Sequence, residues 1–184
     1  MKRTAIISLA MEMIAASFPS LQGRRLKVKM VKTDDYVMAV RLGKSLRLWV
    51  SKADAKRMGR PALIGVLAHE LCHAEEDLQR QGLTWALFSE LCKPLVAREL
   101  SSESATERRI DAAVIRKGYG RQLLAFQKYH DRYYEPYDCT DGMTLGEIEA
   151  ALRNGGALDK GGRSPPPKLG DAICRFGGAT RDGW

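Results

Sequence analysis

The chain has 184 residues, 45% hydrophobic and 28% charged, with a formal net charge of +8. This length and composition predict one globular domain over residues 1–184 with a single core. The chain lacks an apolar run of 18 residues, which excludes a membrane-spanning helix, and its four cysteines show no CxxC spacing. We therefore expect a cytoplasmic protein with reduced thiols and no membrane partner.

The first 20 residues superficially resemble a signal peptide, because Lys2-Arg3 precedes an apolar run. Glu12 interrupts that run, and no small-x-small cleavage site follows it. Apolar residues at helical spacing instead predict an ordinary amphipathic helix. The predicted stripe consists of Ile7, Met11, Ile14 and Phe18.

Three short strands are predicted next, over residues 26–31, 36–42 and 46–50. The first and third alternate in side-chain character, and Gly43-Lys44 is a two-residue turn signal between the second and third. We expect a short antiparallel sheet.

The strand region is strongly basic, since residues 1–60 carry 14 Lys or Arg against 4 Asp or Glu, net +10. Alternation predicts that several cations share one sheet face with Trp49. Such a face is either a nucleic-acid patch or simply the solvated side of a sheet, which is the commoner case. The cations are Arg25, Lys27, Lys29, Arg41 and Arg47.

An HExxH motif, His69-Glu70-Leu71-Cys72-His73, follows within an apolar segment that begins near Pro61. Residues four apart lie on one face of a helix, so both imidazoles can bind one metal ion while Glu70 acts as a base. Cys72 faces elsewhere and is interpreted as packing. The core-facing stripe is predicted to be Ile64, Leu67, Leu71, Ala74 and Leu78.

The third metal ligand is predicted to be a carboxylate. Gln79 occupies the position where the metzincin pattern has its third histidine, and the remaining histidine lies far downstream. A second helix is expected between a cap at Ser101 or Ser102 and a stop at Gly118. It carries three carboxylates four positions apart, a pattern also found on merely solvated helix faces: Glu103, Glu107 and Asp111.

HExxH followed by a Glu-x-x-x-Asp helix resembles the gluzincin clan of zinc metallopeptidases. Residues 107–120 further resemble peptidases related to the HtpX heat-shock protease, although Ile110 replaces the usual Ala. The resemblance implies an α+β zincin-like fold with a mostly helical C-terminal part and one Zn²⁺. It also implies Glu107 as the third ligand, with Asp111 hydrogen-bonded to a ligating imidazole. Glu103 is the rival ligand.

Gluzincins typically bind an extended peptide along the strand before the zinc helix. By resemblance, residues 46–50 would hold substrate here, with Leu46 and Leu48 as contacts. Trp49 would line a substrate pocket, unless it is an ordinary surface aromatic.

Two imidazoles and a carboxylate leave a fourth zinc position for water, whose proton Glu70 would accept. Oxyanion-stabilising candidates lie on a third predicted helix, residues 121–134, where His130 and Tyr134 share a face. Tyr133 and Tyr119 are further candidates, and all of them are alternatively packing residues. Iron also uses two histidines and a carboxylate, but an oxygenase does not need Glu70.

A short helix over residues 144–153, with Glu147 in a capping box, is predicted to end at Asn154-Gly155-Gly156. The Gly/Pro-rich residues 154–184 are expected to wrap the body as a tail.

The predicted function is zinc-dependent hydrolysis of unfolded peptides. Alternatives are a DNA-associated SprT-like protease, whose zinc helix also reads HExCHA but is followed by a third histidine, and a non-catalytic zinc-stabilised module.

Overall fold

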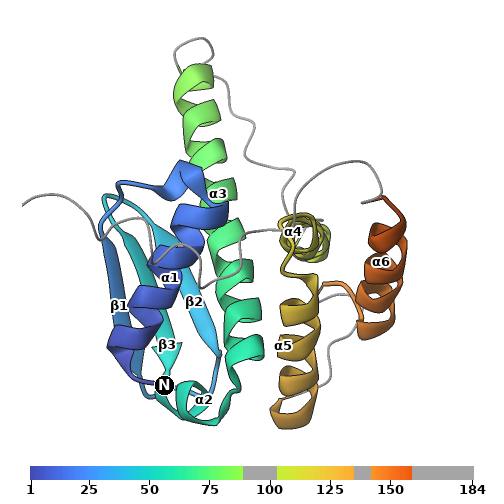
Figure 1. Ribbon diagram of the computed structural model, residues 1–184. Helices are drawn as coiled ribbons and strands as arrows, with labels where there is room; N and C mark the ends of the chain where they lie inside the picture. Colours follow the sequence, from blue (N-terminus) through green and yellow to red (C-terminus); the bar gives the residue numbers. More distant parts are fainter. Residues whose placement is uncertain (89–102, 135–141, 159–184) are drawn as a thin grey trace, which may run out of the picture.

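The computed structural model describes the backbone of residues 1–88, 103–134 and 142–158, and the side chains of residues 1–80, 105–134 and 142–154 (Figure 1). It has an α+β architecture with a small sheet and mostly helical content. In chain order the elements are α1 (Arg3–Ser17), a 3-10 turn η1 (Pro19–Leu21), β1 (Leu26–Val31), β2 (Met38–Leu42), β3 (Leu46–Ser51), α2 (Lys52–Arg57), α3 (Arg60–Phe88), α4 (Glu103–Arg116), α5 (Gly120–Tyr133) and α6 (Leu145–Leu158). None of the described helices is long and apolar enough to cross a membrane.

The three strands form a mixed sheet in the order β1-β3-β2. The β2–β3 hairpin is antiparallel, but β1 runs parallel to β3, with Leu26 opposite Leu46. The prediction of a purely antiparallel sheet is therefore wrong for β1. The physical reason is burial: β3 contributes Leu46, Leu48 and Val50, at most 1% exposed, and so occupies the centre, whereas lysine-bearing β1 lies at an edge.

Helix α1 packs beside the sheet, as predicted, but its buried face only partly overlaps the predicted stripe: Ile14 and Phe18 are buried, and Ile7 packs against the core. Met11 from the predicted stripe is 59% exposed. The helix is apolar on more than one side, so its periodicity alone does not select the buried face. The buried residues are Ile6, Leu9, Ala10, Met13 and Ile14, followed by Phe18 after the helix end.

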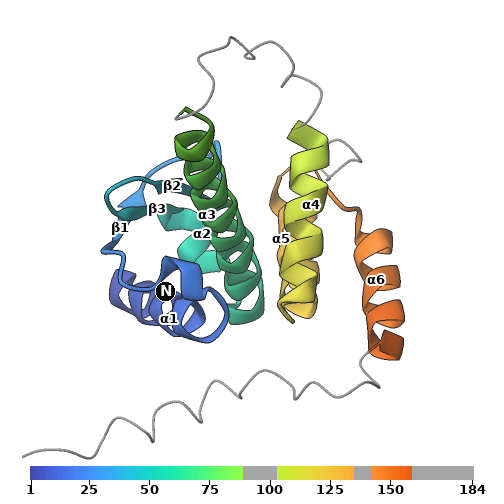
Figure 2. The same cartoon turned by 90° about the horizontal axis from the view of Figure 1, so that it is seen from above.

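Helix α3 is the central element of the fold. Seen from above, it stands between the sheet with α1 on one side and the helical group α4, α5 and α6 on the other (Figure 2). The predicted stripe lies in or against the core, but other faces of the first half of α3 are buried too, for example at Leu63, Ala68 and Cys72. A helix packed from both sides presents side chains to two layers at once.

Helices α3 and α5 are in close backbone contact at Gly65. A Cβ atom added at Gly65 would lie 2.1 Å from the backbone oxygen of Gln122. Only glycine permits this contact, which lies one turn before His69 and fixes the position of α5 beside the HExxH segment.

Helix α4 ends as the sequence predicts. Gly118 has φ 87°, its N–H donates to Ile115 O, and the N–H of Tyr119 donates to Val114 O. This left-handed stop allows α5 to begin at Gly120 and run back beside α3. The predicted caps Ser101 and Ser102 lie outside the described residues.

Helix α6 begins with the predicted capping box. The N–H of Thr144 donates to Glu147 Oε2 over 2.8 Å, and the N–H of Glu147 donates to Thr144 Oγ1 over 3.4 Å. The helix continues to Leu158, so the predicted stop at residues 154–156 is wrong. Glycine weakens a helix interior by about 1 kcal/mol but does not prohibit it. The rest of the predicted tail, residues 159–184, lies outside the described residues.

Replacing Gly65 by Ala should destabilise the protein by about 2–3 kcal/mol, because the added methyl group meets backbone that cannot give way as a side chain can. Urea unfolding followed by circular dichroism measures the change. Gly146→Ala in α6 is the matched control, since a Cβ there has no atom within 4 Å. Equal effects of the two substitutions would contradict the proposed close contact.

Candidate metal centre

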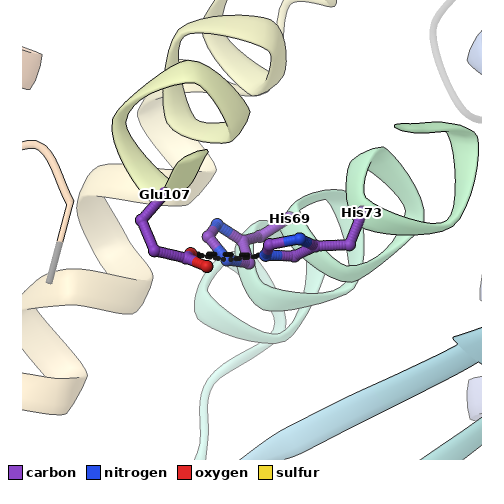
Figure 3. Close-up of side chains that lie close together, drawn as sticks. All are labelled: His69, His73 and Glu107. Atoms are coloured by element: carbon purple, nitrogen blue, oxygen red, sulfur yellow. Dashed lines mark hydrogen bonds and ion pairs between the residues drawn. The ribbon is translucent and has the colours of Figure 1, made fainter. Parts of the chain in front are cut away.

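Three side chains from two helices converge on one point (Figure 3). His69 and His73 come from consecutive turns of α3, and Glu107 comes from α4. The Nε2 atoms of the two imidazoles lie 3.0 Å apart. Glu107 Oε2 lies 3.1 Å from His69 Nε2 and 3.3 Å from His73 Nε2. These three residues could hold a metal ion.

The spacing of the three atoms fits a small divalent ion. Ligands at about 2.0–2.1 Å from a tetrahedral ion are separated from one another by about 3.3 Å. The observed triangle of 3.0, 3.1 and 3.3 Å has nearly that size. Two nitrogens and one carboxylate oxygen form a donor set used by catalytic zinc sites, which keep a further position open.

Asp111 holds His69 from the side opposite the cluster. Its Oδ1 lies 3.0 Å from His69 Nδ1, so Nδ1 carries the donated proton and Nε2 presents its lone pair to the cluster. Asp111 Oδ2 accepts a hydrogen bond of 2.9 Å from the N–H of Met143, and the residue is 1% exposed. Asp111 thus connects the imidazole to the segment that leads into α6.

The electrostatics of the cluster favour a cation. Burial alone would lower the pKa of His69, but hydrogen bonds with Asp111 and Glu107 outweigh it and raise that pKa to about 10. Burial likewise opposes ionisation of Glu107, yet hydrogen bonds with His69 and His73 lower its pKa to about 2. The carboxylates that hold a proton on His69 would equally favour a metal cation between these side chains.

Glu70 faces a cleft of about 180 Å³ that adjoins the cluster at His69. Burial raises the pKa of Glu70 to about 7. The positive charges of His69 and His73 and the backbone of Val40 act in the opposite direction and lower this pKa, but burial outweighs them. The cleft is lined by β2 and the segment before it, by α3 and by α5: Asp35, Tyr36, Val37, Met38, Val66, His69, Glu70, Phe126, His130 and Tyr134.

The two predicted oxyanion candidates, His130 and Tyr134, both line this cleft. Their rings stack with centroids 4.9 Å apart. The hydroxyl of Tyr134 donates its single proton to Asp54 Oδ2 over 2.7 Å, and Tyr129 also donates to Asp54. Tyr134 therefore positions His130, while its own hydroxyl is engaged away from the cluster.

Two other tyrosine candidates lie away from the cleft. Tyr119 OH is 3.0 Å from Ser17 Oγ, and its ring stacks on Phe18. Tyr133 is 42% exposed and lies under the guanidinium of Arg57. Neither lines the cleft.

The prediction that β3 holds substrate as an edge strand is wrong. Strand β3 is paired on both sides, and both Leu46 and Leu48 are fully buried. Trp49, next along the strand from Leu48, points to the opposite face of the sheet. The strand nearest the candidate site is β2, at a sheet edge.

Sequence reasoning missed Asp54 and the backbone of β2. Ser51 caps α2, because its Oγ accepts from the N–H of Asp54 over 3.4 Å. Hydrogen bonds with Ser51, Tyr129 and Tyr134 lower the pKa of Asp54 although burial opposes them. The Ser-x-x-Asp pattern indicates a helix cap from sequence alone, but it does not predict the contact between Asp54 and α5. Cys72, by contrast, is buried as expected, and burial raises the pKa of its thiol to about 12.

Known proteins offer no guide to the role of this site: no family model, no curated protein and no solved structure matches the chain. The chemistry of the site must therefore be inferred from the side chains that the fold brings together. Those are two imidazoles and one carboxylate that could hold a metal ion, a carboxylate that hydrogen-bonds one of the imidazoles, and a further carboxylate at the adjoining cleft.

Replacing Asp111 by Asn should lower the affinity for Zn²⁺ about 10- to 100-fold, because the amide no longer orients His69 with a full negative charge. Titration against a chromogenic chelator measures this affinity. Asp77→Asn, an exposed position on α3, is the matched control. Unchanged affinity of the Asp111 variant would show that its contact with His69 has no part in metal binding.

Substitutions of the two glutamates of α4 should have different effects on the affinity for Zn²⁺. Glu107→Gln should weaken Zn²⁺ binding by at least about 100-fold, since it removes a charged ligand. Glu103→Gln, one helical turn away on the same helix, should bind like the wild type. The reverse order of effects in the same titration would assign the ligand to Glu103.

Proposed function

We propose that this protein is a zinc-dependent peptidase of the gluzincin type. One observation carries the proposal: two Nε2 atoms and a carboxylate oxygen form a triangle of metal-ligand size beside a cleft that Glu70 lines. Glu70 is the residue that separates hydrolysis from mere metal binding. A site that only stabilised the fold would need no carboxylate at an open cleft.

His69, His73 and Glu107 would hold the zinc ion, and Asp111 would orient His69. When bound there, zinc would supply Lewis-acid activation of water and of a peptide carbonyl. A two-histidine, one-carboxylate set also accepts iron, but the cleft-lining Glu70 suits hydrolysis, which needs a proton acceptor.

Glu70 is the proposed proton carrier. Its carboxylate would accept a proton from the attacking water and then donate it to the departing amine. The backbone of Val40 acts to lower the pKa of this carboxylate, which favours the proton-accepting form. The bond broken is the peptide C–N bond, and water supplies the oxygen of the new carboxyl group.

The outer edge of β2, which pairs with no other strand of the described residues, is the proposed substrate-binding edge. The N–H of Ser51 donates to Val37 O over 2.9 Å, so Val37 and Ser51 form a hydrogen-bonded pair. In an antiparallel ladder the hydrogen-bonded pairs alternate, which leaves the backbone groups of Met38 and Val40 directed outwards. Met38 also lines the cleft that Glu70 lines. An extended peptide would pair with this edge by strand addition.

His130 is the proposed donor to the oxyanion. It lines the same cleft as His69 and Glu70, and its stacking on Tyr134 restrains the ring. A donor aimed at developing negative charge contributes more to the transition state than to substrate binding.

The proposal is tested by incubating zinc-loaded protein with a library of unstructured peptides and identifying products by mass spectrometry. Glu70→Gln should bind zinc as the wild type does but cleave at least about 100-fold more slowly. Cleavage at the wild-type rate would exclude Glu70 as the base. A wild type that binds zinc but yields no products would favour the non-catalytic module.

His130→Ala should lower kcat about 100-fold with little change in zinc affinity, since it removes a transition-state donor. Tyr134→Phe should lower kcat less than about tenfold, because its hydroxyl is bonded to Asp54. Steady-state kinetics on one cleaved peptide separates the two variants. A larger loss for Tyr134→Phe would transfer the proposed role from His130 to Tyr134.

A further inference from the structure

The outer face of the sheet is formed by the odd-numbered residues of its strands, whereas the even-numbered residues of β3 are buried under α1 and α3. Figure 2 shows both helices on one side of the strands. Within the described part of the chain, no helix covers the outer face. This surface lies on the opposite side of the sheet from the candidate metal centre.

Strand register places the cations of this face in order. Lys27, Arg47 and Arg41 lie directly opposite one another across all three strands. Lys29, Trp49 and Ala39 form the next row. Arg25 extends the first strand by one more outward position, since its carbonyl accepts from the N–H of Leu46. All five cations are exposed.

Like charges directly opposite one another destabilise a sheet, and nothing among the described residues offsets them here. None of the five cations forms an ion pair with a described acidic side chain. Arg47 contacts only the hydroxyl of Ser45, over 3.5 Å. The face therefore concentrates positive charge that a polyanion would neutralise.

Trp49 stands among these cations at the centre of the sheet. It is half-buried, and its ring makes no stacking or cation–π contact with any described residue. An indole held by a sheet and surrounded by cations is a platform on which an unpaired base can stack, while the neighbouring cations contact phosphates.

We propose that the outer sheet face, formed by Arg25, Lys27, Lys29, Arg41, Arg47 and Trp49, binds single-stranded nucleic acid. The cations neutralise the phosphates, and Trp49 stacks on one base. Duplex DNA hides its base faces, and an anionic membrane has none, so neither would use the indole in this way. The face is separate from the cleft, and the proposal does not depend on peptidase activity.

Fluorescence anisotropy of a labelled oligothymidylate of about 12 nucleotides measures the binding. For single strands log Kobs falls by about 0.7 per neutralised phosphate for each unit of log salt, so contacts from all five cations predict a slope of about −3.5. The double variant Lys27→Gln, Arg47→Gln should reduce that slope by about 1.4 units. Lys56→Gln, Arg121→Gln is the matched control, which removes two exposed cations from α2 and α5.

Trp49→Leu should weaken binding about tenfold, whereas Trp49→Phe, which keeps an aromatic ring, should retain most of it. The pair separates stacking from any loss of packing. Equal weakening by the two double variants would overturn the proposal, since it would reduce the effect to net charge. The absence of salt-dependent binding would also overturn the proposal. So would tighter binding to a hairpin duplex or to phosphatidylserine vesicles than to the single strand, if substitution of Trp49 did not change that binding.

Discussion

The burial of α3 between two layers is the constraint on which the rest of the structure depends. One side of the helix packs on the sheet and α1, and the other packs on α4 and α5. Gly65 removes the side chain that would keep α5 away. Because α3 is held from both sides, His69 and His73 face the seam between the layers, where α4 brings Glu107. The candidate metal centre is thus a consequence of how the two halves of the molecule meet.

The seam between the two layers buries ionisable side chains, whose burial would be unfavourable without hydrogen-bond partners. His69 is 7% exposed and Asp111 is 1% exposed, so neither is solvated well enough to be stable without a partner. His69 and Asp111 are hydrogen-bonded to each other, and Asp111 also accepts a hydrogen bond from the N–H of Met143. On the same helix, Arg108 pairs with Glu147 and donates to Gly142 O over 3.0 Å. These polar contacts connect the start of α6 to α4, the helix that carries Glu107.

The sheet separates two surfaces of different chemistry. On its inner side, β2 presents a free edge and Met38 to a cleft that holds Glu70 and His130. On its outer side, the same three strands carry cations in register and a central Trp49. Because side chains alternate along a strand while backbone groups point sideways, one small sheet provides both the proposed peptide-binding edge and the proposed nucleic-acid-binding face.

The sequence by itself determined what depends on local spacing. HExxH on a helix, the four-residue interval between Glu107 and Asp111, the stop at Gly118 and the β2–β3 hairpin are all short-range patterns, and periodicity specifies them. Only the tertiary structure decided which strand takes the centre, which face of α1 is buried, that β2 rather than β3 borders the cleft, and that Asp54 engages Tyr134. Those outcomes depend on competition among distant segments for the same core, and local periodicity carries no information about that competition.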